Sequence, residues 1–218
     1  MRTYEDLLVD GMKICQESGA YKFTSDSILL SRFARAKKND VVADLCAGSG
    51  IVGLHFYALN RPVVKRLVLF EMQKTLCGLA RESVRINALE NVVSVREGRV
   101  QDIGAEFAGA FSLVLCNPPY YPKARAKGEN FALECCKYEL SVCMEEIVFT
   151  AAKCLKSGGR FCVAYPSERL AELMSALKKY RLEPKRLAVV SGGKKAYLAL
   201  AEAVKDGRAG LKIEIGEN

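Results

Sequence analysis

Short apolar runs alternate along this chain with stretches in which apolar residues recur every three or four positions. The runs predict buried strands and the helical spacing predicts amphipathic helices. This alternation predicts an α/β fold: a doubly wound, mostly parallel, seven-stranded sheet with helices on both faces. The predicted strands are residues 41–45, 66–70, 92–96, 111–116, 160–165, 185–190 and 195–203. The predicted helices are residues 25–36, 51–59, 73–88, 141–155 and 167–180.

Both ends of the chain depart from this alternation. Residues 5–16 predict a β-hairpin, because Asp10-Gly11 favours a type I′ turn between two short apolar runs. Ser191-Gly192-Gly193 is short enough to join the last two strands as a hairpin, so we expect the final strand to run antiparallel. The expected organisation is one domain, 1–218, with an N-terminal hairpin and helix (1–36), a core (37–204) and an irregular tail (205–218).

Composition narrows the classes of protein that fit. The chain has 218 residues, half of them hydrophobic, which is enough for a large core. It contains no stretch of 18 apolar residues and its first residues lack the apolar segment of a signal peptide, so we expect a cytoplasmic protein without a membrane span. The net charge of +8 favours a polyanionic partner such as nucleic acid. The oligomeric state stays open.

The nine cysteines do not predict a disulfide framework, because their number is odd and no Cys-x-x-Cys pair occurs. Several stand inside apolar stretches, where a thiol packs as a small hydrophobe. These are Cys46, Cys116, Cys154 and Cys162. Cys135, Cys136 and Cys143 could instead hold a metal, but histidine is absent nearby and the usual zinc spacing is missing. We therefore expect no metal site.

The most informative motif is Asn117-Pro118-Pro119-Tyr120, which follows the apolar run 111–116. A residue before proline is held in an extended conformation, and Pro118 has a carbonyl but no N–H. The Asn117 side-chain oxygen and the Pro118 carbonyl can together accept both hydrogens of one planar amino group, while Tyr120 stacks on its ring. We predict that these four residues are catalytic and make a conjugated amino nitrogen attack an electrophile. The alternative is a surface turn capped by the asparagine.

A glycine-rich turn follows the predicted strand 41–45. Asp44 precedes Gly48-Ser49-Gly50, and a helical pattern resumes at once, which brings backbone N–H groups and a helix N-terminus to a bound cofactor. Glu71 ends the next strand, where a carboxylate can bind ribose hydroxyls of either NAD or S-adenosylmethionine. The glycines also fit a dinucleotide pattern, so a nicotinamide dehydrogenase is an alternative. Asp44 and the Asn-Pro-Pro-Tyr motif favour S-adenosylmethionine as the methyl donor.

Together these motifs resemble class I S-adenosylmethionine methyltransferases that methylate amino groups, which implies a Rossmann-like fold. The hairpin and the segments 21–26 and 183–187 are similar to the bacterial tRNA adenine-N6 methyltransferases that modify the adenine beside the anticodon of valine tRNA. The resemblance covers almost the whole chain and implies a tRNA substrate. A ribosomal RNA base and a glutamine amide of a protein are alternative substrates. The non-enzymatic alternative is a module that binds S-adenosylmethionine and RNA without catalysis.

The resemblance also implies which residues bind the donor. They are Lys22, Phe23, Thr24, Asp26, Asp44, Gly48, Ser49, Gly50, Glu71, Met72, Arg99, Val100 and Asn117. The family usually has an acid just past the third strand to bind the amino group of the donor adenine. Here Arg99 occupies that place and Asp102 follows, so the residue that contacts the adenine stays open. Lys137-Tyr138-Glu139 stands where many relatives have Arg-His-Glu.

Basic residues near the motif and near the end of the sheet predict contacts with RNA phosphates. One group is Lys123, Arg125 and Lys127, for which a solvated loop is the alternative. The other is Lys185, Arg186, Lys194 and Lys195. His55 is the single histidine, and we expect it to pack or lie at the surface rather than to act in catalysis.

Overall fold

The computed structural model describes residues 1–128, 130–193 and 195–214. A two-stranded hairpin contains β1 (Arg2–Asp6) and β2 (Lys13–Glu17). The main sheet contains β3 (Asp40–Leu45), β4 (Val64–Glu71), β5 (Val93–Glu97), β6 (Phe111–Cys116), β7 (Leu155–Pro166), β8 (Leu182–Gly192), β9 (Lys195–Lys205) and β10 (Lys212–Glu214). The α-helices are α1 (Ser25–Phe33), α2 (Ile51–Asn60), α3 (Lys74–Ile86), α4 (Phe131–Cys135), α5 (Met144–Cys154) and α6 (Leu170–Lys179).

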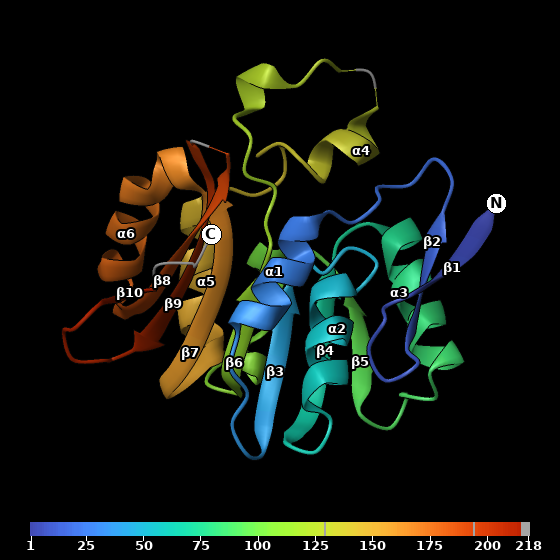
Figure 1. Cartoon of the computed structure of the whole chain (residues 1–218), viewed down its shortest axis with the longest axis horizontal. Helices are drawn as coiled ribbons and strands as arrows, with labels where there is room; N and C mark the ends of the chain where they lie inside the picture. Colours follow the sequence, from blue (N-terminus) through green and yellow to red (C-terminus); the bar gives the residue numbers. More distant parts are fainter. Residues whose placement is uncertain (129, 194, 215–218) are drawn as a thin grey trace.

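The main sheet has the strand order β10-β8-β9-β7-β6-β3-β4-β5 (Figure 1). Every neighbouring pair is parallel except the two that involve β9, which runs antiparallel to β7 and β8. The predicted α/β class, the mostly parallel sheet and the antiparallel direction of strand 195–203 are therefore confirmed. From β3 the chain adds β4 and β5 on one side of the sheet, whereas β6 and β7 lie on the other side of β3. The order in which strands are added therefore reverses between β3 and β6, although these two strands are parallel.

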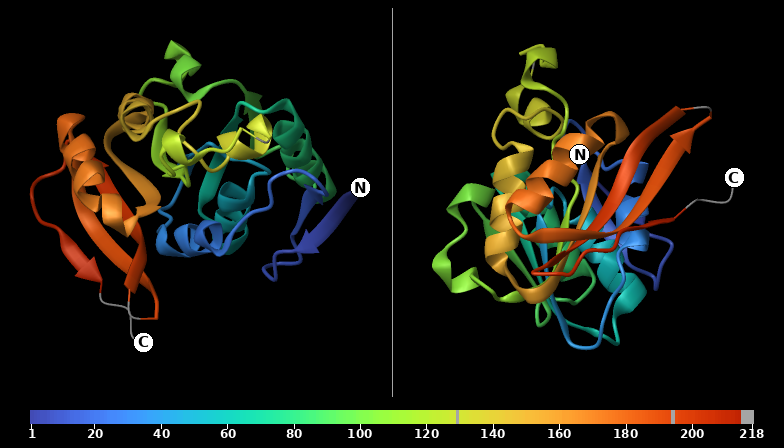
Figure 2. Two further views of the ribbon diagram at one scale, coloured as in Figure 1. Left: turned by 90° about the horizontal axis from the view of Figure 1, so that it is seen from above. Right: turned by 90° about the vertical axis from the view of Figure 1, so that its left-hand side faces the viewer.

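Strands of the sheet alternate their side chains between two hydrophobic layers. Leu113 and Leu115 of β6 pack with α1, α2 and α3, whereas Val114 and Cys116 pack with α5 and α6. This alternation follows from the two-residue period of a strand. The helices therefore cover both faces of the sheet, as Figure 2 shows from above, and the hairpin β1–β2 lies beside α3 at the end opposite β10.

Two details of the predicted fold were wrong. The sheet has eight strands rather than seven, because Lys212–Glu214 in the tail pairs in parallel with β8, so this part of the tail is not irregular. The hairpin has the predicted turn, with Asp10 and Gly11 both at positive φ and Met12 N–H donating to the Val9 carbonyl at 3.0 Å. Its strands, however, begin further from the turn than the apolar residues suggested.

A long excursion, residues 117–143, rises from the end of β6 and carries α4 above the carboxyl ends of the strands (Figure 1). Helix α1 passes close to the base of this excursion. Two polar contacts join them: Asn117 to Ser27 and Tyr120 to Asp26. The first helix and the strongest sequence motif therefore meet at one edge of the sheet.

Candidate active site

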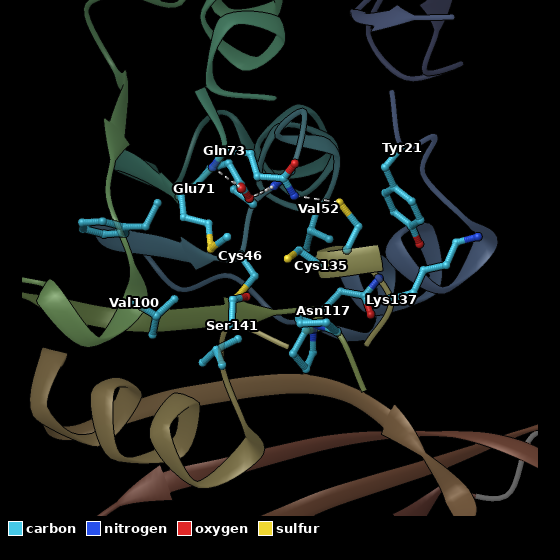
Figure 3. Close-up of a pocket in the computed structure, with 18 of the residues that line it drawn as sticks. Tyr21, Cys46, Val52, Glu71, Gln73, Val100, Asn117, Cys135, Lys137 and Ser141 are labelled. Atoms are coloured by element: carbon cyan, nitrogen blue, oxygen red, sulfur yellow. Dashed lines mark hydrogen bonds between the residues drawn. The ribbon is translucent and has the colours of Figure 1, made fainter. Parts of the chain in front are cut away.

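A pocket lies at the carboxyl ends of β3, β4 and β6, where ligands bind in open α/β sheets with such a reversal of strand order. Its volume is about 950 Å³, including the space that is open to solvent. Loops from each strand supply its walls, and Figure 3 shows Glu71, Val100 and Asn117 around it. The predicted site residues that line it are Phe23, Gly48, Ser49, Glu71, Met72, Val100, Asn117, Pro118, Pro119 and Tyr120.

The glycine loop after β3 turns sharply into α2. Gly50 caps the helix with φ of +90°, in the left-handed region that favours glycine. A Cβ atom on Gly50 would lie 2.9 Å from the Leu69 side chain, so a methyl group there would require this side chain to shift. The loop therefore passes close to the sheet and leaves space for a ligand on its outer side.

Asp44 lies beneath this loop and is fully buried. Its Oδ2 accepts a 2.8 Å hydrogen bond from the Gly53 N–H in the first turn of α2, and its Oδ1 has no partner among the described residues. Burial raises the pKa of Asp44 to about 8; the bond from Gly53 opposes this shift and the charge of Glu71 adds to it. Asp44 does not line the pocket and holds the glycine loop through Gly53; its contact with the donor stays a prediction.

Glu71 joins two loops of the pocket wall. Its Oε2 accepts a hydrogen bond from Gly48 N–H at 2.9 Å, and its Oε1 accepts one from Gln73 N–H at 2.8 Å. Burial raises the pKa of this carboxyl, while the backbone bonds oppose the shift. Each oxygen keeps a second lone pair, so Glu71 can still accept hydrogen bonds from a diol such as a ribose.

Asn117 is held by one side of its amide. Its Nδ2 donates a 3.0 Å hydrogen bond to Ser27 Oγ, whereas its Oδ1 is buried without a partner among the described residues. A buried hydrogen-bond acceptor without a partner is costly and rare in folded proteins, so it indicates that a hydrogen-bond donor of a ligand belongs there. Pro118 follows on the same pocket wall. Both residues of the predicted acceptor pair therefore line the same pocket.

Tyr120 is fixed on three sides. Its hydroxyl donates a 2.7 Å hydrogen bond to Asp26, its N–H donates to the Lys137 carbonyl, and its own carbonyl accepts from Arg169. Burial, together with the hydrogen bond to Asp26 and its charge, raises the pKa of Tyr120, so the hydroxyl stays protonated. The ring meets that of Tyr121 edge to face at 5.0 Å between centroids. Asp26 thus positions Tyr120, instead of lining the donor pocket as predicted.

Four more predicted donor contacts lie off the pocket wall, and Gly50, whose neighbours Gly48 and Ser49 line the pocket, is one of them. Lys22 and Thr24 line a neighbouring groove instead. Arg99 is exposed and donates to the Ser141 carbonyl at 3.2 Å, and Asp102 is exposed as well. Of the residues after β5, Gly98, Val100 and Gln101 line the pocket. Arg99 and Asp102, the two candidates for the adenine contact, do not.

The sequence analysis also missed residues that line the pocket: Tyr21, Ser27, Cys46, Gln73, Cys135, Cys136, Lys137 and Ser141. Most come from α1 or from the excursion, whose path above the sheet carries no local signal. Gln73 donates from Nε2 to the Cys136 sulfur at 3.1 Å, which joins the start of α3 to the excursion. Cys136 is largely buried, and burial raises its thiol pKa to about 12, so it stays a neutral thiol.

The three cysteines considered for metal binding have other surroundings. Cys143 takes part in a capping box at the start of α5 with Glu146, whereas Cys135 and Cys136 line the pocket. Among residues 1–128, 130–193 and 195–214, no group of three or more His, Cys, Asp or Glu side chains is arranged to hold a metal ion. His55 is buried, with its Nδ1 2.7 Å from Ser31 Oγ, which confirms that it packs in the core.

The predicted RNA contacts differ in how accessible they are to a phosphate. Lys123, Arg125 and Lys127 are exposed on the excursion and Lys195 is exposed at the start of β9, so phosphates could reach them. Lys194 lies outside the described residues. Further along β8, Lys185 donates to the Arg208 carbonyl at 2.6 Å.

Arg186 is a correction. It is buried, and its guanidinium pairs with Glu202 at 3.1 Å and with Glu214 at 2.8 Å. It also lies 4.3 Å from the centroid of the Phe33 ring. A cation held by two carboxylates and an aromatic face has no free donor group to offer a phosphate, so the structure argues against an RNA contact and gives Arg186 a role in tying β8 to β9 and β10.

None of the helices in the described part of the chain is both long enough and apolar enough to span a membrane. The finding is consistent with the short, amphipathic helices that the sequence predicts.

Solved structures of methyltransferases share the fold. A predicted O-methyltransferase from Agrobacterium tumefaciens is 24% identical, with a TM-score of 0.65, over 87% of this chain and 85% of that chain. The tRNA m1G37 methyltransferase of M. jannaschii is 14% identical, with a TM-score of 0.66, over 95% of this chain and 56% of that chain. At these identities the likeness concerns the fold alone, and it confirms the predicted Rossmann-like architecture.

Relatives and a family model are more specific. The chain is 27% identical over 164 residues to the tRNA1(Val) (adenine(37)-N6)-methyltransferase of Cronobacter sakazakii, covering 75% of this chain and 66% of the relative. Its counterpart in Proteus mirabilis is 25% identical over 145 residues, covering 66% of this chain and 57% of the relative. The chain thus spans less than two thirds of the length of these curated relatives. Because a family model matches residues 19–181, well over half of the chain, this protein belongs to the methyltransferase small domain family.

Proposed function

We propose that this protein methylates an exocyclic amino group with S-adenosylmethionine as the donor, and that the group is N6 of an adenine in tRNA. The observation that carries the proposal is the buried Oδ1 of Asn117, which has no hydrogen-bond partner in the described part of the chain; Pro118 lies next to it on the wall of the pocket. A planar amino group has two hydrogens, and these two residues supply two acceptors.

The pocket residues fit the donor. Glu71 presents carboxylate lone pairs for ribose hydroxyls, and Gly48 and Ser49 of the glycine loop line the same pocket. Val100 and Gln101 line the pocket just after Arg99, the position at which the family usually has an acid for the donor adenine. When bound, S-adenosylmethionine supplies a methyl group on a sulfonium, which is already a good electrophile. The protein's main task is therefore to position the acceptor.

Asn117 and Pro118 do more than hold the acceptor. The lone pair of an adenine amino nitrogen is spread into the ring, which makes this nitrogen a weak nucleophile. When both N–H bonds are accepted by oxygens out of the ring plane, the nitrogen becomes pyramidal and the lone pair is localised on it. Tyr120, held by Asp26, offers a ring on which the base can stack, worth about 1–3 kcal/mol. That gain offsets part of the cost of swinging the base out of structured RNA.

Three observations support tRNA as the substrate. The named relatives are tRNA adenine-N6 methyltransferases, the net charge is +8, and exposed Lys123, Arg125 and Lys127 follow the catalytic motif. A tRNA substrate would also place the enzyme in the cytoplasm. We treat residues 1–218 as one methyltransferase domain, within which the N-terminal helix supplies part of the site.

The test compares methyl acceptors. The protein and labelled S-adenosylmethionine are incubated with whole tRNA, with ribosomal RNA and with a glutamine-containing release-factor fragment, and the RNA nucleosides are analysed by mass spectrometry. We expect N6-methyladenosine in tRNA. Label in the protein fragment but in neither RNA would overturn the proposal, and label in ribosomal RNA alone would replace the substrate.

A pair of variants tests the chemistry. Asn117→Ala should bind the donor as the unaltered protein does but lose most of its turnover, because the acceptor matters chiefly in the transition state. Asn91→Ala is the matched control, since Asn91 is exposed in a turn away from the pocket. Near-normal turnover of Asn117→Ala would contradict the amino-group mechanism.

A further inference from the structure

A second groove opens beside the pocket and shares part of its wall. The shared residues are Tyr21, Tyr120, Tyr121 and Lys137, and Figure 3 shows Tyr21 and Lys137 on the side of the pocket away from Val100. The groove continues past them to the start of β9. Donor and target base account for the pocket but leave this groove unexplained. The part of the substrate that neighbours the target base at Tyr120 would therefore enter this groove.

The groove is positively charged, and its cations are available. Four basic residues line it: Lys22, Arg125, Lys137 and Lys195. All four are exposed, and none forms an ion pair within the described part of the chain. Of the two acids on the same wall, Asp26 already accepts the Tyr120 hydroxyl and Glu168 is exposed. Unpaired cations in a groove attract phosphates.

Two tyrosines stand in the groove with much of their surface exposed, Tyr121 at 41% and Tyr197 at 45%. Tyr121 is rigid, because its N–H donates to the Lys137 carbonyl at 2.9 Å and its ring packs against Tyr120 and Tyr138. Rigid, exposed aromatic rings beside unpaired cations are the combination with which proteins bind single-stranded nucleic acid.

The position of Tyr197 depends on an irregularity in the sheet. Val190 of β8 pairs with Leu198 of β9, but the next residue, Ser191, pairs with Ala196, so Tyr197 is the extra residue of a β-bulge. Such bulges re-aim a side chain and are frequent beside functional sites. The bulge thus directs an aromatic ring that regular pairing would place elsewhere.

We propose that this groove binds a nucleotide next to the target base in single-stranded RNA. Tyr197 and Tyr121 stack on its base, and Lys22, Arg125, Lys137 and Lys195 contact its phosphates. The inference rests on the proposed function, since it assumes that the target base belongs to RNA. It makes the substrate an unpaired loop segment rather than a free nucleoside or a duplex, because a neighbouring base must be unstacked to reach the tyrosines.

The test measures binding of a labelled single-stranded RNA heptamer with a central adenine, by fluorescence anisotropy, with adenosine as the minimal probe. Tyr197→Ala should weaken heptamer binding by roughly 5- to 150-fold, which corresponds to the loss of one stacked base, and Tyr197→Phe should restore it. Neither change should alter donor affinity measured by calorimetry. Tyr4→Ala, at an exposed tyrosine of the N-terminal hairpin, is the matched control and should bind the heptamer normally.

The phosphate contacts have a separate signature. Arg125→Ala combined with Lys195→Ala should lower the slope of log affinity against log salt by about 0.7 for each contact that is lost. A second exposed pair near the start of β4, Lys65 and Arg66, lies outside the groove and provides the control; its replacement should leave the slope unchanged.

Failure of this inference is distinguishable from failure of the proposed function. If RNA is methylated in an Asn117-dependent way but Tyr197→Ala leaves heptamer affinity and KM unchanged, the groove proposal is wrong and the proposed function stands. If no RNA is methylated and an acidic peptide such as oligoglutamate displaces the heptamer from the groove, both the groove proposal and the proposed function are overturned.

Discussion

The hydroxyl of Tyr120 donates a 2.7 Å hydrogen bond to the Asp26 carboxylate, 94 residues earlier in the chain. One residue further along α1, Ser27 accepts a hydrogen bond from Asn117 at 3.0 Å. The first turn of α1 therefore holds the Asn-Pro-Pro-Tyr motif at both of its ends. The segment before β3 is thus part of the active-site framework, and its substitution should change catalysis as well as stability.

Replacement of Tyr120 separates the roles of its ring and its hydroxyl. Tyr120→Phe keeps the stacking ring but leaves buried Asp26 without this partner, so we expect a loss of about 1.5–3 kcal/mol of stability with most of the turnover retained. Tyr120→Ala also removes the stacking ring, so this variant should lose most of the turnover in addition to stability. Tyr138→Phe, at a neighbouring tyrosine, controls for loss of a hydroxyl. Urea denaturation and methyl transfer measure the two effects, and a Tyr120→Phe variant as inactive as Tyr120→Ala would show that the hydroxyl itself is required.

Replacement of Ser27 tests whether it positions Asn117. Ser27→Ala removes the group that holds Asn117 Nδ2, so the amide can rotate and kcat should fall while KM for the donor stays unchanged. Ser25→Ala is the matched control, because Ser25 is exposed two residues earlier in the same helix. Equal loss of kcat in both variants would mean that Ser27 acts only through the stability of α1.

Much of the fold could be predicted from the sequence because its signals are local. The run 111–116 is apolar throughout and is a buried strand, and the glycine loop and Asn117 both follow such strands. Parallel strands place their carboxyl ends at one edge, so motifs that are distant in the sequence meet there. Strand β10 escaped prediction because Lys212–Glu214 has a single apolar residue and pairs only at the sheet's edge.

The parts of the site that could not be predicted depend on contacts between distant segments. Asp26 and Ser27 have the composition of an ordinary helix start, and nothing in their neighbourhood indicates that they reach the catalytic motif. Arg186 is basic and close to the sheet's end, as an RNA contact would be. Only the pairing of three strands shows that Glu202 and Glu214 already surround it.

Glu71→Gln tests the donor site. The amide keeps the shape of the carboxyl but loses its charge and turns an N–H₂ group toward a backbone N–H, so we expect donor affinity to fall by roughly ten- to a hundredfold. Glu97→Gln is the matched control, since Glu97 pairs with Glu71 on the adjacent strand but is exposed outside the pocket. Calorimetry with S-adenosylmethionine and its demethylated product measures both. Unchanged affinity in Glu71→Gln, or tighter binding of NAD by the unaltered protein, would contradict the assignment.

Asp44 should make stability depend on pH in a defined direction. Its pKa is about 8 in the folded protein because of burial, against about 3.9 in an unfolded chain. Between these values the folded protein binds the proton and the unfolded chain does not. Its contribution to stability is therefore full below about pH 4 and is lost as the pH rises to about 8, at up to about 1.4 kcal/mol per pH unit.

Asp44→Asn should remove this dependence, because the amide imitates the protonated carboxyl and its oxygen can still accept from Gly53 N–H. Relative to the unaltered protein, the variant should gain stability steadily from pH 5 to pH 8. Urea denaturation of the donor-free protein at each pH measures the difference, with Asp102→Asn as the control at an exposed aspartate. If the stability curves of Asp44→Asn and the unaltered protein run parallel, Asp44 ionises normally in the fold, and burial beneath the glycine loop does not keep it neutral.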